Sequence, residues 1–126
     1  EILDATSGDQ PTMIRDHAIL MIFAVYGVRS REVSRLRLDD IDWQGKGIVF
    51  IRAKLGGSHS FPLQQCVGAA IVRYLKEVRP KSRCREVFLT RHAPIGPLSA
   101  GALWAVVGRQ LRGRALLIKH HGPHSL

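Results

Sequence analysis

The sequence predicts a mainly α-helical protein with a small antiparallel β-sheet, an α+β fold. Three segments, 13–26, 64–79 and 99–112, carry apolar residues at helical spacing. Between the first two lies a β-branched and aromatic run, 48–51, which a pair of glycines separates from a second extended segment, 58–63. Two such runs joined through glycines are typical of a hairpin, so we expect a hairpin or a three-stranded sheet at one edge of the helices.

Length and composition indicate one basic domain. The chain has 126 residues, enough for a single hydrophobic core. It holds 19 Lys and Arg against 10 Asp and Glu, a formal net charge of +9. This balance favours a polyanionic partner, with nucleic acid ahead of membrane. We expect no membrane association, because no apolar run reaches the roughly 18 residues of a span. The two cysteines show no metal-ligand spacing, which suits a reduced, intracellular protein.

The first predicted helix is the most apolar segment of the chain. Residues 13–26 are apolar on nearly every side, so we expect a central helix that is covered by other elements. Gly27 is expected to end it. Ser30 is then predicted to cap a short second helix, in which Val33 and Leu36 face inward.

Arg29 lies where this buried helix meets the surface, and an unpaired guanidinium there would be costly. Glu32, three residues on, could hold it through a local ion pair. An external phosphate could also hold it, because the guanidinium fork matches two phosphate oxygens, and the two possibilities are compatible. The alternative is an ordinary surface arginine at a helix end. Arg31 and Arg35, four residues apart, are predicted to lie together on the exposed side.

The later elements follow from helix and strand boundary signals. Pro62 restricts the second strand to an edge or to a strand end. Pro80 ends the helix predicted for 64–79, and 87–89 reads as a short buried segment. Ser99 is expected to cap the last helix.

The chain ends in a histidine-rich segment that invites a metal interpretation. His120, His121 and His124 lie within five residues. Gly122 and Pro123 prevent the first two from sharing a helical face with the third, so no metal site is expected. The other interpretation places Pro123 in the first turn of a new helix, whose N-terminal N–H groups and a histidine face an anion.

Several segments occur in an order that matches one known family. They are Arg15 to Leu20, Tyr26-Gly27-Val28-Arg29-Ser30-Arg31-Glu32-Val33, Leu36 to Asp42, Lys54-Leu55-Gly56-Gly57-Ser58-His59-Ser60-Phe61-Pro62-Leu63, Tyr74 to Pro80, Val87-Phe88-Leu89 and Gly122-Pro123-His124-Ser125-Leu126. Together they resemble the catalytic domain of the tyrosine recombinases, the phage integrase family. The resemblance covers nearly the whole chain and implies a tyrosine recombinase catalytic-domain-like fold.

The resemblance implies a site-specific DNA recombinase, which cleaves and rejoins DNA strands through a 3'-phosphotyrosine and needs no metal or cofactor. Arg29 would be the first of two arginines that stabilise the phosphate, with Glu32 positioning it. Lys54 would give a proton to the departing 5' oxygen. His124 would hydrogen-bond the phosphate or handle the proton of the nucleophile. We expect these three cationic residues to converge on one basic concave face.

The implied partner is double-stranded DNA, bound by a tetramer of the full-length protein in the cytoplasm, at the nucleoid of a prokaryote or in phage infection. Arg31, Arg35, His59 and His121 are expected to contact the DNA. The hairpin departs from the family pattern, because Gly57 and His59 stand where a lysine and an arginine are usual. Some phosphate contacts should therefore be missing and others should depend on pH.

We expect residues 1–126 to be a partial catalytic domain that is truncated at both ends. By the resemblance, the second arginine should directly follow Leu126, and the nucleophilic tyrosine should lie some tens of residues later. Tyr26 and Tyr74 are not expected to replace it, because one adjoins the core helix and the other lies on an inner helical stripe. The chain alone should therefore bind DNA without cleaving it. The alternative is a non-catalytic basic nucleic-acid-binding domain or a decayed integrase remnant.

Overall fold

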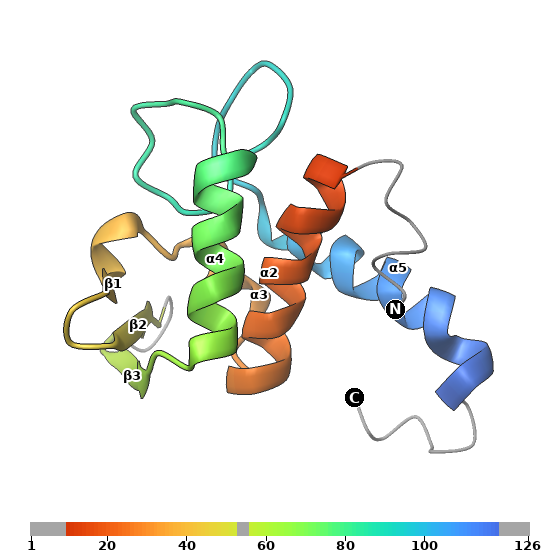
Figure 1. The fold of residues 1–126 in the computed structure, drawn as a ribbon, viewed down its shortest axis with the longest axis horizontal. Coiled ribbons are helices and arrows are strands. Elements are labelled where there is room, and N and C mark those ends of the chain that lie inside the picture. The colour runs from red at the N-terminus through yellow and green to blue at the C-terminus, as the bar shows by residue number, and fades with distance from the viewer. Residues whose placement is uncertain (1–9, 53–55, 119–126) are drawn as a thin grey trace.

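The fold is mainly helical, with one small sheet at its edge (Figure 1). The computed structural model describes residues 10–52 and 56–118, and side chains as far as residue 109. In chain order the elements are α2 (Gln10–Tyr26), α3 (Ser30–Ser34), the 3-10 turn η2 (Leu38–Asp40), β1 (Ile41–Asp42), β2 (Gly47–Ile51), β3 (Ser58–Pro62), α4 (Gln65–Glu77) and α5 (Ala100–Ile118). The predicted α+β fold class is confirmed.

Helix α2 forms the centre of the molecule, as its sequence predicts. It packs along α4 and also contacts α5 (Figure 1). Ile19 and Ile22 are fully buried in the shared core, whereas Val25 near the end of the helix is 39% exposed. The helix therefore has one uncovered side in the described structure, although its sequence is apolar nearly all round. Gly27 ends it in the left-handed region at φ 64°, as expected.

The three strands form an antiparallel sheet in the order β1-β2-β3. Phe50 pairs with His59 and Ile48 pairs with Phe61, so these four side chains lie on one face of the β2–β3 hairpin. Ile48 and Phe50 are fully buried, which places this face against the core. Pro62 ends β3, as predicted.

Two helix boundaries test the predicted caps. Ser99 is confirmed as a cap, because its Oγ accepts the N–H of Ala102 at 3.1 Å. Ser30 is not the cap of the second helix, because α3 already begins at Ser30 and Arg29 occupies the N-cap position. An arginine side chain has no acceptor atom, so another group must satisfy the first N–H groups of α3.

The short segment Val87-Phe88-Leu89 lies in the middle of the core, with exposed fractions of 0–1%. It forms no regular strand and is held by long-range contacts. The Tyr74 hydroxyl accepts the N–H of Leu89 at 3.0 Å, and Arg79 donates to the carbonyl oxygens of Glu86 and Val87. Helix α4 and the residues that directly follow it therefore fix a segment that the sequence marks only by three apolar residues.

Replacing Tyr74 with phenylalanine should lower the free energy of unfolding by about 1–3 kcal/mol, because the buried Leu89 N–H would lose its acceptor. Burial raises the pKa of Tyr74 above its ordinary value of 10.0, while the Leu89 N–H and Arg79 offset part of this rise. The folded state then keeps a proton that the unfolded chain releases above about pH 10. This stabilisation is complete below that pH and is lost as the pH rises toward the folded pKa.

Urea unfolding at neutral and alkaline pH measures both effects. The wild type should lose stability more steeply above about pH 10 than the Tyr74→Phe variant, which lacks the ionisable group. Equal stability of the two proteins at neutral pH would contradict the proposed role of the hydroxyl.

Within the described part of the chain, none of the helices combines the length and the apolar character that crossing a bilayer requires.

Candidate functional site

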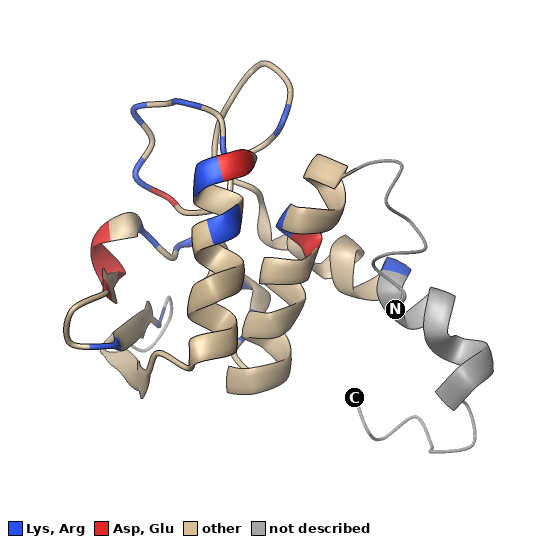
Figure 2. Cartoon of the chain, in the orientation of Figure 1, with Lys and Arg blue, Asp and Glu red and all other residues tan. Residues whose placement is uncertain are grey.

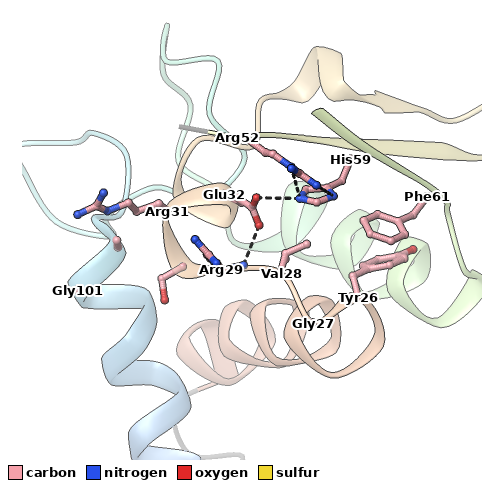
Figure 3. Close-up of a pocket in the computed structure, with 12 residues that line it drawn as sticks. Tyr26, Gly27, Val28, Arg29, Arg31, Glu32, Arg52, His59, Phe61 and Gly101 are labelled. Atoms are coloured by element: carbon pink, nitrogen blue, oxygen red, sulfur yellow. Dashed lines mark hydrogen bonds and ion pairs between the residues drawn. The ribbon is translucent and has the colours of Figure 1, made fainter. Parts of the chain in front are cut away.

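A hollow of about 740 Å³ opens where the end of α2, the start of α3, the β2–β3 hairpin and the start of α5 meet. We name it the Arg29 hollow (Figure 3). Its lining residues are Tyr26, Gly27, Val28, Arg29, Ser30, Arg31, Glu32, Arg52, His59, Phe61, Ala100 and Gly101. Four separate segments of the chain thus contribute to one site.

The backbone around Gly27 places Arg29 at this hollow. Gly27 turns the chain at the end of α2, and Arg29 follows in an extended conformation, at φ −86° and ψ 157°. Glu32 Oε1 accepts the backbone N–H of Arg29 at 2.9 Å. The Glu32 carboxylate, at the third position of α3, therefore forms the half of a capping box that satisfies the N–H of the N-cap residue.

Glu32 thus contacts Arg29 through the main chain, whereas the sequence suggested an ion pair with the guanidinium. Among the described residues, the guanidinium groups of Arg29 and Arg31 have neither an ion pair nor a hydrogen bond. Both side chains are exposed. In Figure 3, Arg29 lies below Glu32, and Arg31 extends toward the start of α5. The site therefore presents two unpaired guanidinium groups whose backbone is held in place.

The hairpin contributes a third guanidinium that the sequence interpretation missed. Arg52 Nε lies 2.8 Å from His59 Nε2, and Arg52 Nη2 lies 3.1 Å from His59 Nδ1. His59 Nε2 also lies 3.3 Å from Glu32 Oε2 (Figure 3). Strand alternation could have revealed Arg52, because it stands two residues after the inward-facing Phe50.

Aromatic contacts fix the hairpin against the end of α2. The ring of Tyr26 lies 5.1 Å from that of Phe61 and 5.8 Å from that of Phe50, between ring centroids. The Tyr26 hydroxyl donates to the Pro62 carbonyl at 2.8 Å and accepts the N–H of Gln64 at 3.0 Å. Tyr26 therefore has a structural role in the site, in agreement with the expectation that it is not a nucleophile.

Three of the predicted site residues lie outside the described residues. These are Lys54, His121 and His124, which fall in 53–55 and 119–126. The expected convergence of Arg29, Lys54 and His124 accordingly stays a prediction.

Arg31 and Arg35 are both exposed, as expected, but they line different hollows. Arg35 borders a second hollow of about 510 Å³, together with Arg37 and Ser99. Arg31 of α3 and Arg35, which directly follows α3, therefore line two different depressions of the surface.

The charge of the Arg29 hollow is strongly positive. Three arginines line it, and Glu32 is the one carboxylate among the lining residues. Figure 2 shows that α2 and α4 carry few charged residues, whereas many basic residues lie on the connecting segments. Neighbouring guanidinium groups suit the oxygens of a phosphate, so the hollow has the chemistry of a phosphate site.

Within residues 10–52 and 56–109, no three or more His, Cys, Asp or Glu side chains gather in a way that could hold a metal ion.

The family model for "Phage integrase family" matches residues 1–126, the whole chain. This chain therefore belongs to the phage integrase family.

The relatives agree with this assignment. A putative integrase/recombinase, y4gC, of Sinorhizobium fredii is 36% identical over 124 residues, which are 98% of this chain and 64% of the relative. The tyrosine recombinase XerD of Listeria innocua is 27% identical over 131 residues, covering 100% of this chain and 43% of the relative. The chain thus spans less than two thirds of the length of these proteins.

A solved structure has the same fold. It is the integrase of the Tn1549 transposon in complex with circular intermediate DNA, with a TM-score of 0.57 and 21% sequence identity. The alignment covers 88% of this chain and 40% of that integrase. The described residues therefore have an integrase catalytic-domain-like fold.

Proposed function

We propose that this chain is part of the catalytic domain of a site-specific tyrosine recombinase, and that the Arg29 hollow binds a backbone phosphate of double-stranded DNA. The observation that carries the proposal is the way in which Arg29 is held at the hollow. Its backbone is held by Glu32, and its guanidinium has no partner among the described residues. All the N–H donors of this guanidinium are therefore available to a phosphate.

The chemistry of strand cleavage suits such a site. When a tyrosine hydroxyl attacks the phosphorus, negative charge accumulates on the non-bridging oxygens of the five-coordinate phosphate. Arg29 would stabilise this charge. Lys54 would protonate the departing 5' oxygen, and His124 would hydrogen-bond the phosphate or take the proton of the nucleophile. The tyrosine would come from a part of the protein other than Tyr26 and Tyr74, whose hydroxyls are bonded within the fold.

The proposed partners follow from the same reaction. The exposed Arg31 and Arg35 would contact further phosphates, as would His121. The relatives include recombinases and a DNA-bound integrase, which supports DNA as the partner. We further propose that the whole protein acts as a tetramer on DNA in the cytoplasm, at the nucleoid.

Trapping of a covalent protein–DNA adduct tests the proposal. The protein expressed from the complete reading frame would be incubated with nicked duplex DNA that carries the sequences flanking its gene. We expect an adduct that survives denaturing electrophoresis, formed through a 3'-phosphotyrosine. Intact, salt-sensitive DNA binding without any adduct would instead support the alternative, a non-catalytic basic nucleic-acid-binding domain.

A further inference from the structure

A chain of contacts connects Arg52 of the hairpin to the backbone of Arg29. Arg52 contacts both ring nitrogens of His59, at 2.8 and 3.1 Å. His59 Nε2 lies 3.3 Å from Glu32 Oε2, and Glu32 Oε1 accepts the Arg29 N–H at 2.9 Å (Figure 3). Glu32 is nearly buried, with 9% of its side chain exposed, whereas His59 has 31% exposed. The imidazole therefore lies between a fixed carboxylate and a guanidinium at the surface.

The imidazole cannot satisfy both neighbours through the same nitrogen. Neutral histidine has one N–H donor and one acceptor nitrogen. Whichever ring nitrogen carries the proton, the other can accept an N–H of Arg52: Nε2 from Arg52 Nε at 2.8 Å, or Nδ1 from Arg52 Nη2 at 3.1 Å. Only the tautomer with its proton on Nε2 can also donate to Glu32 Oε2. His59 then orients Arg52 toward the hollow that both residues line.

The hollow gathers positive charge beside Arg52. The other cationic groups that line it are Arg29 and Arg31. A phosphate in the hollow would relieve the repulsion among the three guanidinium groups and would accept hydrogen bonds from their N–H groups.

We infer that Arg52 is an additional phosphate-binding residue of the Arg29 hollow, and that His59 is its positioning residue. The inference rests on the proposed function, because it names a further contact to the same DNA backbone. Nη1 of Arg52 makes no hydrogen bond or ion pair with the described residues, so it can donate to a phosphate while the other nitrogens face His59.

Replacing Arg52 with alanine should weaken DNA binding about tenfold at about 0.1 M salt, and should make the dependence of log K on log salt less steep by about one unit. Fluorescence anisotropy with a short fluorescein-labelled duplex measures both quantities on this chain. The matched control is Arg73→Ala, because Arg73 is an exposed arginine of α4 that pairs with Glu77 and lines neither hollow. The Arg52→Lys variant should keep the salt dependence, since it keeps the charge.

The His59 variants test the positioning role. His59→Gln keeps one donor and one acceptor, so it should retain the affinity of the wild type within about twofold. His59→Ala keeps neither, so it should bind severalfold more weakly.

The outcomes distinguish this inference from the proposed function. If Arg29→Ala weakens binding while Arg52→Ala resembles Arg73→Ala, the inference fails and the proposed function stands. If neither Arg29→Ala nor Arg52→Ala changes the affinity, both fail. A His59→Ala variant that binds DNA as tightly as the wild type would overturn the role of His59. Equal thermal midpoints of the variants would show that the changes in affinity do not come from unfolding.

Discussion

Replacing Arg29 with alanine is expected to slow DNA strand cleavage by about two to three orders of magnitude, measured as single-turnover adduct formation by the protein from the complete reading frame. The guanidinium would act mainly on the transition state, because charge on the phosphate oxygens is greatest there. DNA affinity should fall by only about tenfold at about 0.1 M salt, the effect of one phosphate contact. The rate of cleavage should therefore fall much more than the affinity.

Two variants sharpen this prediction. Arg29→Lys keeps the charge but loses the planar fork, so it should restore affinity better than cleavage. Arg73→Ala removes an exposed arginine that lines neither hollow, and it should leave both quantities nearly unchanged. Equal losses of affinity and cleavage in Arg29→Ala would assign this residue to DNA binding alone.

Replacing Phe88 with alanine is expected to lower the free energy of unfolding by about 3–5 kcal/mol. Phe88 is 1% exposed, and its ring lies 5.1 Å from that of Tyr74, between centroids. The substitution would remove this ring contact and leave a cavity in a close-packed interior. Domains of this size are stable by only about 5–15 kcal/mol, so the variant should be close to unfolding.

Urea unfolding followed by circular dichroism measures the effect. Trp104→Ala is the matched control, because Trp104 is also a large aromatic residue but is 65% exposed on α5. We expect the control to change the stability by less than about 1 kcal/mol. Similar losses for Phe88→Ala and Trp104→Ala would contradict the central position of the Val87-Phe88-Leu89 segment.

The helices and the hairpin could be predicted because their signals are local. Apolar residues at helical spacing marked α2, α4 and α5, and the β-branched and aromatic run around Phe50 marked β2. The ends of the helices were predicted less accurately. Helix α2 begins three residues earlier than predicted, and α4 ends two residues earlier. Helix ends depend on caps and neighbours, as the cap of α3 shows, where Glu32 and not Ser30 supplies the acceptor.

The sequence by itself determined that the chain is a basic α+β domain, that it resembles the phage integrases, and that Arg29 and Glu32 lie close together. It could do so because these properties depend on composition, on short-range periodicity and on residues only three positions apart. Only the tertiary structure decided that Glu32 holds the backbone of Arg29 and also faces His59, and that Arg52 joins the same hollow. These contacts cross from α3 to the hairpin, and packing of the aromatic side chains, not sequence spacing, sets the distance between those two elements.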